Sequence, residues 1–253
     1  MLARDGTTND AIAPGERQSP LFSCRDIALD LGGREILRNI SLHVAPGEVL
    51  GIIGPNGAGK TSLFEVLSGR MTPKGGSVKF KGADVTTLPL HARARLGIGR
   101  TYQTPVIPEE LTVAETFKAA RQAYHPYLTR FDAEYGAELV GLHVKDDTPA
   151  TRLDTLDRRK LLLACLLMRR PSLLLMDEPA AGLINAEVDE IDYLLRLLSK
   201  EMDVSVIIVE HRIELLATVA DRVLVMDAGE VISEGSIEDI LGDPKVHAAY
   251  FEN

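Results

Sequence analysis

Short apolar runs separated by glycine and proline fill the chain from about residue 21 to residue 80. Residues 21–31 and 36–44 are apolar-rich runs on either side of a Gly-Gly pair, which predicts two strands joined by a turn. Residues 49–53 form a short apolar run typical of a parallel strand that is buried on both faces. A glycine-rich turn follows, then residues 62–67 with helical spacing. Residues 77–80 predict another strand.

The pattern becomes helical between about residues 105 and 153. Apolar residues there recur at spacings that suit helices, namely Leu111, Val113, Phe117, Tyr124, Leu128, Phe131, Leu139 and Leu142. We therefore expect a small helical subdomain over approximately 105–170, inserted into an α/β core.

Helices and strands alternate in the rest of the chain. Helical spacing is found at residues 158–168, 186–200 and 213–220. Apolar runs typical of buried strands occupy 173–176 and 204–209, and a hairpin is expected over 222–234. Because alternating strands and helices build a mainly parallel sheet, the sequence predicts an α/β fold. We find no internal repeat, so we expect a single α/β unit of this kind.

Composition narrows the class of protein. Apolar residues make up 45% of the 253-residue chain, which is enough for a substantial core. The net charge of −9 argues against a nucleic-acid binder and against electrostatic adhesion to anionic lipid. Cys24 and Cys165 lie far apart in apolar surroundings, so we expect small buried residues and neither a disulfide nor a metal site.

The chain lacks the run of ~20 apolar residues that a membrane-spanning helix needs. Residues 1–20 have no apolar stretch of the kind found in secretory signals, and their Gly, Pro, Thr and Asn content predicts a disordered extension. We expect residues 21–253 to form a soluble, cytoplasmic domain that reaches a membrane only through a protein partner.

A glycine-rich loop is the first segment along the chain that indicates a binding site. It matches G-x-x-x-x-G-K-[ST] with Gly54, Pro55, Asn56, Gly57, Ala58, Gly59, Lys60 and Thr61, followed by Ser62. The glycines let backbone N–H groups turn toward phosphates, and the following helix points its positive end at them. Lys60 can reach the β- and γ-phosphates, and the Thr61 hydroxyl can ligate Mg²⁺. The flanking strand and helix make a chance glycine turn the weaker alternative.

Two adjacent carboxylates end a buried strand. Residues 173–176 lead directly into Asp177, Glu178 and Pro179. At such a strand end Asp177 suits a water-mediated contact with Mg²⁺, and Glu178 is placed to polarise an attacking water. An isolated acidic pair is more often a solvated strand end, but the phosphate loop and Pro179 favour the catalytic interpretation.

Four motifs, taken in order, resemble those of ABC ATPases. Residues 54–61, Gln103, the pair Asp177 and Glu178, and His211 after Glu210 look like the Walker A motif, Q-loop, Walker B motif and H-loop of that family. The resemblance covers nearly the whole chain from Leu21 onward. It implies a P-loop NTPase core with a mainly parallel sheet, an N-terminal antiparallel β subdomain and an inserted α-helical subdomain.

The resemblance also implies ATP and Mg²⁺ as ligands. In the family's pattern Gln103 would contact Mg²⁺ and the attacking water and would couple hydrolysis to the helical subdomain. His211 would form a hydrogen bond with the γ-phosphate. Taken alone, Gln103 would be an ordinary surface residue and His211 a structural one.

Two further segments resemble a narrower group. Residues 180–183 and 243–250 look like those of the ATP-binding subunits of branched-chain amino acid importers and their urea or amide relatives. This implies a peripheral location at the cytoplasmic face of the cell membrane, docked on transmembrane permease subunits and indirectly serving a solute-binding protein. Docking would use the region of residues 103–111.

The segment at residues 153–157 departs from the family. Where members carry a signature resembling Leu-Ser-Gly-Gly-Gln, this chain has Leu-Asp-Thr-Leu-Asp. In the family the signature contacts the γ-phosphate bound to the partner subunit. Asp154 would place a like charge there, which at ~4 Å costs several kcal/mol, and Leu156 replaces a glycine. Asp154 also suits a helix N-cap. Both interpretations predict a lost signature, and the cations at 158–160 would offset the charge only in part.

Two other positions also differ from the family. Leu31 stands where an aromatic residue usually stacks on adenine, so it offers apolar contact without a ring. Ile184 replaces the polar residue usual in the loop after the Walker B motif, which places communication across a dimer in question.

An intact Walker side and an altered signature together predict a heterodimer. One site would combine this chain's Lys60, Gln103, Asp177, Glu178 and His211 with the signature of a second, different ABC ATPase subunit, and the other site would hydrolyse poorly. A regulatory, nucleotide-binding subunit with little hydrolysis remains an alternative. A soluble ABC protein acting on ribosomes or DNA is disfavoured by the acidic charge and the single nucleotide-binding unit.

Overall fold

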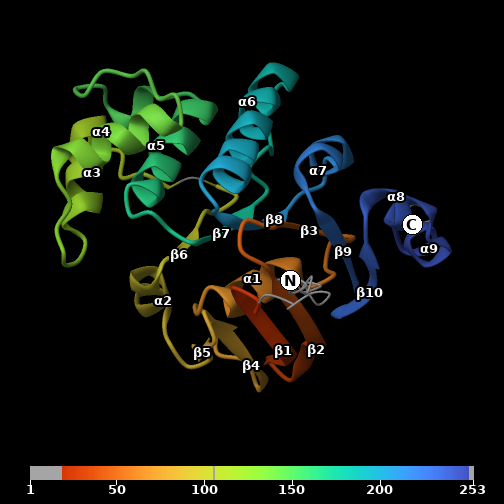
Figure 1. The fold of residues 1–253 in the computed structure, drawn as a ribbon. Coiled ribbons are helices and arrows are strands. Elements are labelled where there is room, and N and C mark those ends of the chain that lie inside the picture. The colour runs from red at the N-terminus through yellow and green to blue at the C-terminus, as the bar shows by residue number, and fades with distance from the viewer. Residues whose placement is uncertain (1–18, 105, 251–253) are drawn as a thin grey trace, which may run out of the picture.

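The structure is a computed structural model that describes residues 19–104 and 106–250, and the strands of this described part form two sheets (Figure 1). The first is antiparallel with strand order β2-β1-β4-β5. Its strands are β1 (Phe22–Leu31), β2 (Arg34–Val44), β4 (Gly75–Phe80) and β5 (Ala83–Asp84).

The second sheet lies at the centre of the molecule and has the order β10-β9-β3-β8-β7-β6. It is parallel except between β9 and β10. Its strands are β3 (Val49–Ile53), β6 (Ile98–Arg100), β7 (Leu173–Asp177), β8 (Ser205–Val209), β9 (Arg222–Asp227) and β10 (Glu230–Gly235). The predicted α/β fold with a mainly parallel sheet and an N-terminal antiparallel part is confirmed.

Helices cover both faces of the central sheet. They are α1 (Lys60–Leu67), α2 (Leu90–Leu96), α3 (Val113–Gln122), α4 (Arg130–Leu139), α5 (Thr155–Leu167), α6 (Asn185–Arg196), α7 (Ile213–Val219), α8 (Ile237–Gly242) and α9 (Pro244–Tyr250). A short 3₁₀ turn, η1 (Ala150–Arg152), precedes α5, and a π-helical turn, η2 (Leu197–Glu201), continues α6. In Figure 1 α3, α4 and α5 gather on the side away from the antiparallel strands.

The central strands divide the core into two clusters because successive side chains point to opposite faces. On β3, Leu50 and Ile52 pack with α1 and the antiparallel sheet, whereas Val49 and Ile53 pack with the opposite cluster, which includes α5, α6 and α7. Every residue of β3, β7 and β8 is buried. This double burial explains why these strands are continuous apolar runs in the sequence.

The structure corrects several predicted boundaries. The helix expected at 158–168 begins at Thr155. The helix expected at 186–200 changes to a π-helical turn at Leu197. Within residues 83–100, where the sequence predicted no element, the structure contains β5, α2 and β6. The extension predicted at 1–20 lies outside the described residues up to residue 18, and the subdomain boundary at 105–170 stays a prediction.

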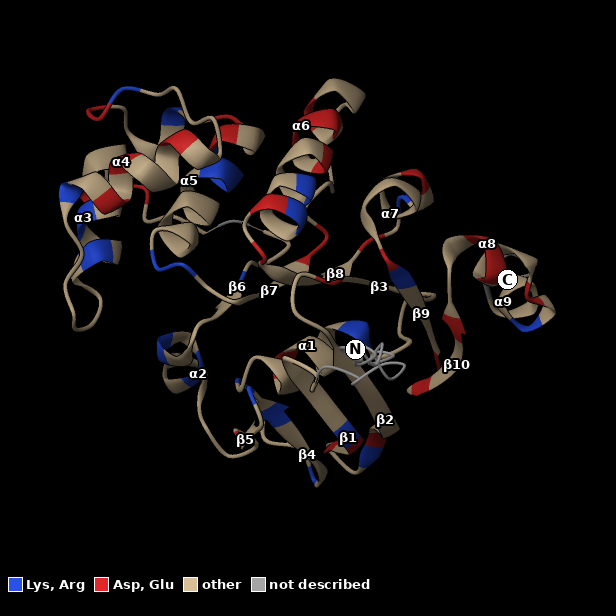
Figure 2. Cartoon of the chain, viewed as in Figure 1, with Lys and Arg blue, Asp and Glu red and all other residues tan. Residues whose placement is uncertain are grey.

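The surface carries charges of both signs. In Figure 2 Lys and Arg positions occur on α2, α3 and α5, and Asp and Glu positions on α4, α6 and α8.

Cys24 and Cys165 are free thiols, and burial raises the pKa of each to about 12. No helix in the described part of the chain is long and apolar enough to cross a membrane.

Candidate functional site

The glycine-rich loop connects β3 to α1 and needs glycine for its conformation. Gly57 and Gly59 have φ values of 84° and 99°, in the left-handed region, and Gly59 is the N-cap of α1. A Cβ on Gly54 would collide with the carbonyl oxygen of Met226 on β9. The loop therefore presents the first N–H groups of α1 at the carboxyl edge of the sheet, which is the arrangement that binds phosphate.

Lys60 lies over this loop. Its Nζ donates to the carbonyl oxygens of Gly54 at 2.6 Å and Pro55 at 3.0 Å. Burial lowers the pKa of Lys60, and the carboxylates of Glu178 and Asp177 oppose that shift. The ammonium group is thus bound to the loop's carbonyl oxygens, and the two nearby carboxylates favour its charged form.

Glu178 brings three loops together. Gln103 Nε2 donates to its Oε2 at 2.6 Å, and His211 Nε2 lies 3.2 Å from its Oε1. Gln103 follows β6, Glu178 follows β7 and His211 follows β8, and these three strands are neighbours in the parallel sheet. The carboxyl ends of parallel strands meet at one edge, where open α/β sheets bind their ligands. The three predicted catalytic residues therefore share one cleft of about 500 Å³ with Gly54, Pro55 and Asn56.

Asp177 ends β7 and is buried. Burial raises the pKa of its carboxyl, and the nearby Arg100 guanidinium opposes this effect. Asp177, Thr61 and Gln103 line one cavity. Among the described residues no group of three His, Cys, Asp or Glu could hold a metal. Mg²⁺ nevertheless fits here, because it prefers oxygen ligands and is commonly bound by one or two protein side chains together with substrate phosphates and water.

Leu31 lies apart from the loop's own cleft. That cleft, of about 540 Å³, is lined by Arg34, Ile36 and residues 56–62, and Leu31 is not among the described residues that line it. Leu31 is 42% exposed and is paired with Arg34 across the β1–β2 hairpin. Sequence reasoning missed Arg34 and Ile36 because their position beside the loop depends on the register of this hairpin.

Two further residues near Glu178 were also missed. Glu210 is 2% exposed and accepts hydrogen bonds from the backbone N–H groups of Ala180, His211 and Arg212. Arg159 on α5 donates to the carbonyl oxygens of Pro179 and Ala181. The only available signals in the sequence were a carboxylate beside His211 and an arginine in the family's signature helix.

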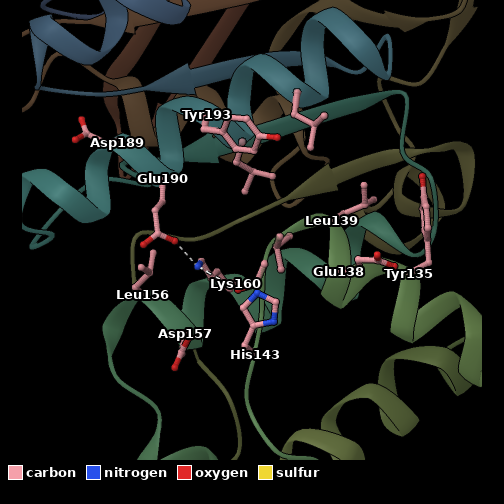
Figure 3. Close-up of a pocket in the computed structure, with 14 residues that line it drawn as sticks. Tyr135, Glu138, Leu139, His143, Leu156, Asp157, Lys160, Asp189, Glu190 and Tyr193 are labelled. Atoms are coloured by element: carbon pink, nitrogen blue, oxygen red, sulfur yellow. Dashed lines mark hydrogen bonds and ion pairs between the residues drawn. The ribbon is translucent and has the colours of Figure 1, made fainter.

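The segment that replaces the signature is built into the fold. Asp154 is the N-cap of α5, as predicted, and its Oδ1 accepts from Asp157 N at 2.8 Å. Leu156 is buried, at 7% exposure. Figure 3 shows Leu156 and Asp157 at a cavity of about 1060 Å³ between α4, α5 and α6.

The three cations that follow Asp154 are engaged by other groups. Lys160 pairs with Glu190 across that cavity (Figure 3). Arg158 donates to Ala150 O at 3.1 Å, and Arg159 holds the loop after β7. None of these contacts joins the cations to Asp154, and the partial offset of its charge stays a prediction.

Comparisons with known proteins agree on one family. A protein-family model described as ABC transporter matches residues 37–181. The chain is 32% identical over 250 residues to the high-affinity branched-chain amino acid transport ATP-binding protein LivG of Escherichia coli (strain K12), covering 91% of this chain and 97% of that protein. It is also 32% identical over 234 residues to the lipopolysaccharide export system ATP-binding protein LptB of Acidithiobacillus ferridurans, covering 92% and 97%. Its fold is similar to the crystal structure of the ADP conformation of MJ1267, an ATP-binding cassette of an ABC transporter, with a TM-score of 0.85 and 27% identity over 93% of this chain and 100% of that one.

Proposed function

Because this chain belongs to the ABC transporter family as an ATP-binding and ATP-hydrolysing subunit, we propose that it powers uptake of branched-chain amino acids or related amino acids and amides, as one half of an asymmetric ATPase pair. The observation that carries the catalytic part is the Glu178 carboxylate, held between Gln103 and His211 beside the phosphate loop.

The chemistry follows from that geometry. Lys60 and the N–H groups at the start of α1 bind the phosphates, and Glu178 accepts a proton from the water that attacks the γ-phosphate. His211 donates toward the γ-phosphate, and Gln103 orients the water. When bound, Mg²⁺ neutralises charge that develops between the β- and γ-phosphates, and Thr61, Asp177 and the Gln103 amide oxygen are the residues that would hold it. The nucleoside would extend past Arg34 and Ile36 toward Leu31.

The asymmetric pairing is supported by the start of α5. Asp154 is committed to capping that helix, and Leu156 is packed into the core. Neither can present hydroxyl or close-approaching backbone to a phosphate on another subunit. A partner ATPase subunit with an intact signature would complete the site that contains Glu178.

The uptake direction is supported by similarity to LivG and by residues 180–183 and 243–250. LptB, a relative of equal identity, is named for export. Uptake of labelled leucine into vesicles that hold the assembled transporter distinguishes the two directions, because an export subunit gives no accumulation that depends on external substrate.

Docking on permease subunits would place the chain at the cytoplasmic face of the membrane, with a solute-binding protein on the other side. The cavity of about 690 Å³ that Thr61, Gln103 and Asp177 line supports this, since it also has apolar walls that include Leu162, Leu163 and Leu166 of α5. Val106, at 78% exposure, lies on its rim.

The test of the pairing is light scattering on the Glu178→Gln chain with ATP and Mg²⁺, after ATP binding has been confirmed. Blocked hydrolysis traps any dimer that ATP can hold together. We expect the chain to bind ATP and remain monomeric until a partner with an intact signature is added. A stable ATP-dependent homodimer would show that Asp154 and Leu156 are tolerated and would remove the argument for an asymmetric pair.

A regulatory subunit with little hydrolysis is the second candidate. It is favoured by Leu31, by Asp154 and by Leu156, and disfavoured by the intact contacts of Glu178 and His211. In the assembled pair, Glu178→Gln in this chain should remove most ATPase activity if Glu178 is the working base, and should leave it nearly unchanged if the chain is regulatory.

A further inference from the structure

The short loop from β7 to α6 is held by two side chains from other elements. Arg159 on α5 donates to Pro179 O at 2.7 Å and to Ala181 O at 2.6 Å. Glu210, which follows β8, accepts from Ala180 N at 2.9 Å. Three consecutive residues of the loop are thus each bound by a side chain that is distant in the sequence.

Glu178 starts this loop in a strained conformation. Its φ of 47° lies in the left-handed region, which a non-glycine residue keeps only when its surroundings impose it. On the strand side Glu178 N donates to Val209 O at 2.9 Å, and on the loop side Ala181 N donates to Glu178 O at 3.1 Å. The carbonyls at 179 and 181 are the ones that Arg159 binds, so the guanidinium completes the hydrogen bonding of the turn.

Glu210 links the same loop to the turn that carries His211. Its Oε2 accepts from His211 N at 2.8 Å and from Arg212 N at 3.1 Å, while its Oε1 binds Ala180 N. One buried carboxylate therefore binds both the backbone that follows Glu178 and the backbone of His211, and it fixes the distance between them. The side chains of those two residues meet at 3.2 Å.

We propose that Arg159 and Glu210 are positioning residues for Glu178, which hold its backbone so that its carboxylate reaches both Gln103 and His211. Because Arg159 belongs to α5, a displacement of α5 relative to β7 is transmitted through two hydrogen bonds to the loop behind Glu178. The helix that would face the partner nucleotide is in this way connected to this chain's own catalytic carboxylate. The inference rests on the proposed function, in which Glu178 is the base.

The test uses the full chain and a spectroscopic readout that does not depend on hydrolysis. The ring of His211 reports on the carboxylate beside it, so its Cε1–H resonance is recorded by NMR and assigned with His211→Asn. The resonance of the Glu178→Gln chain gives the reference for a changed carboxylate. Arg159→Ala and Glu210→Gln are compared with Arg158→Ala, the matched control, because Arg158 also donates from α5 to a backbone carbonyl, Ala150 O, but not to this loop.

We expect Arg159→Ala and Glu210→Gln to move the His211 resonance at least half of the way to its Glu178→Gln position, with ATP affinity within about twofold of the unmodified chain. Arg159→Lys keeps donors within reach of the carbonyls, so its His211 resonance should lie close to that of the unmodified chain. Arg158→Ala should leave the His211 resonance unchanged. An unchanged resonance in Arg159→Ala overturns the proposal, as does an equal change in Arg158→Ala. If the assembled pair proves not to hydrolyse ATP, the proposed function fails independently of this result.

Discussion

Asp177 shows at the scale of one residue how a buried carboxylate costs stability. Burial raises the pKa of its carboxyl, so between the unfolded pKa and the raised folded pKa the folded chain holds more protons than the unfolded chain. Stability therefore falls as pH rises through that window, and the penalty is fully present above it. A charge kept at this cost suits a cation site better than a purely structural role.

Asp177→Asn should therefore stabilise the nucleotide-free chain at pH 7. We expect a higher melting temperature, because the variant does not bury a charge. The gain should disappear as pH falls below the ordinary pKa of an Asp carboxyl, about 3.9, because the carboxyl is then protonated in both states. Differential scanning calorimetry at several pH values measures this, with the exposed Asp189→Asn as control. A lower melting temperature for Asp177→Asn at pH 7 would contradict the sign.

The residues of the site were predictable to different degrees. Lys60, Asp177 and Glu178 follow directly from local patterns, because a phosphate loop and a strand-end carboxylate are recorded in consecutive residues. Gln103 and His211 needed the family's order of motifs, since nothing local distinguishes them. Arg159 and Glu210 were not predictable, because the bonds by which they hold the loop after Glu178 go to backbone groups 20 and 30 positions away along the chain.

At the scale of an element, two substitutions at the start of α5 distinguish the capping role of Asp154 from its effect on pairing. Asp154→Ala should cost about 1 kcal/mol of unfolding free energy through loss of the bond to Asp157 N, whereas Asp154→Ser keeps an N-cap oxygen and should be nearly neutral. Urea denaturation of the two variants checks this, and equal losses would contradict the capping role.

The same helix start can then be converted toward the family pattern. In the Glu178→Gln background, Asp154→Ser with Leu156→Gly should permit an ATP-dependent homodimer. Leu156→Gly is the more destabilising change, because deleting a buried leucine side chain lowers the free energy of unfolding by about 2–5 kcal/mol. Asp154→Ser alone separates an effect of charge from an effect of the missing glycine.

Elements were predicted well where the buried residues are apolar and poorly where they are not. β3, β7 and β8 are buried on both faces, so they appear as apolar runs. β6 has only three residues, one of them glycine and one Arg100, whose charge is paired with Glu65 inside the protein at 2.8 Å. A buried ion pair removes the hydrophobic signal that a sequence pattern requires.

At the scale of the whole molecule, two exposed apolar residues belong to different proposed interfaces. Val106 is 78% exposed beside the cavity next to α5, and Ile184 is 68% exposed at the N-cap of α6, in the loop after Glu178. The first lies where permease subunits would dock and the second where the partner ATPase subunit would. The same substitution can therefore be made at each, with a matched change in chemistry and in exposure.

Val106→Lys should reduce co-purification with permease subunits at least tenfold, because a charge in a docking surface must be desolvated without a partner. It should leave ATP affinity and pairing with the second ATPase subunit unchanged. Ile184→Lys should show the converse, with pairing lost and permease binding retained; Lys is chosen because Asp would resemble the polar residue usual at this position in the family. Affinity capture of the assembled transporter from membranes, with light scattering for the ATPase pair, measures both. If either substitution abolishes both interactions, the two surfaces are not separate; if neither changes any interaction, the assignment of these surfaces is wrong.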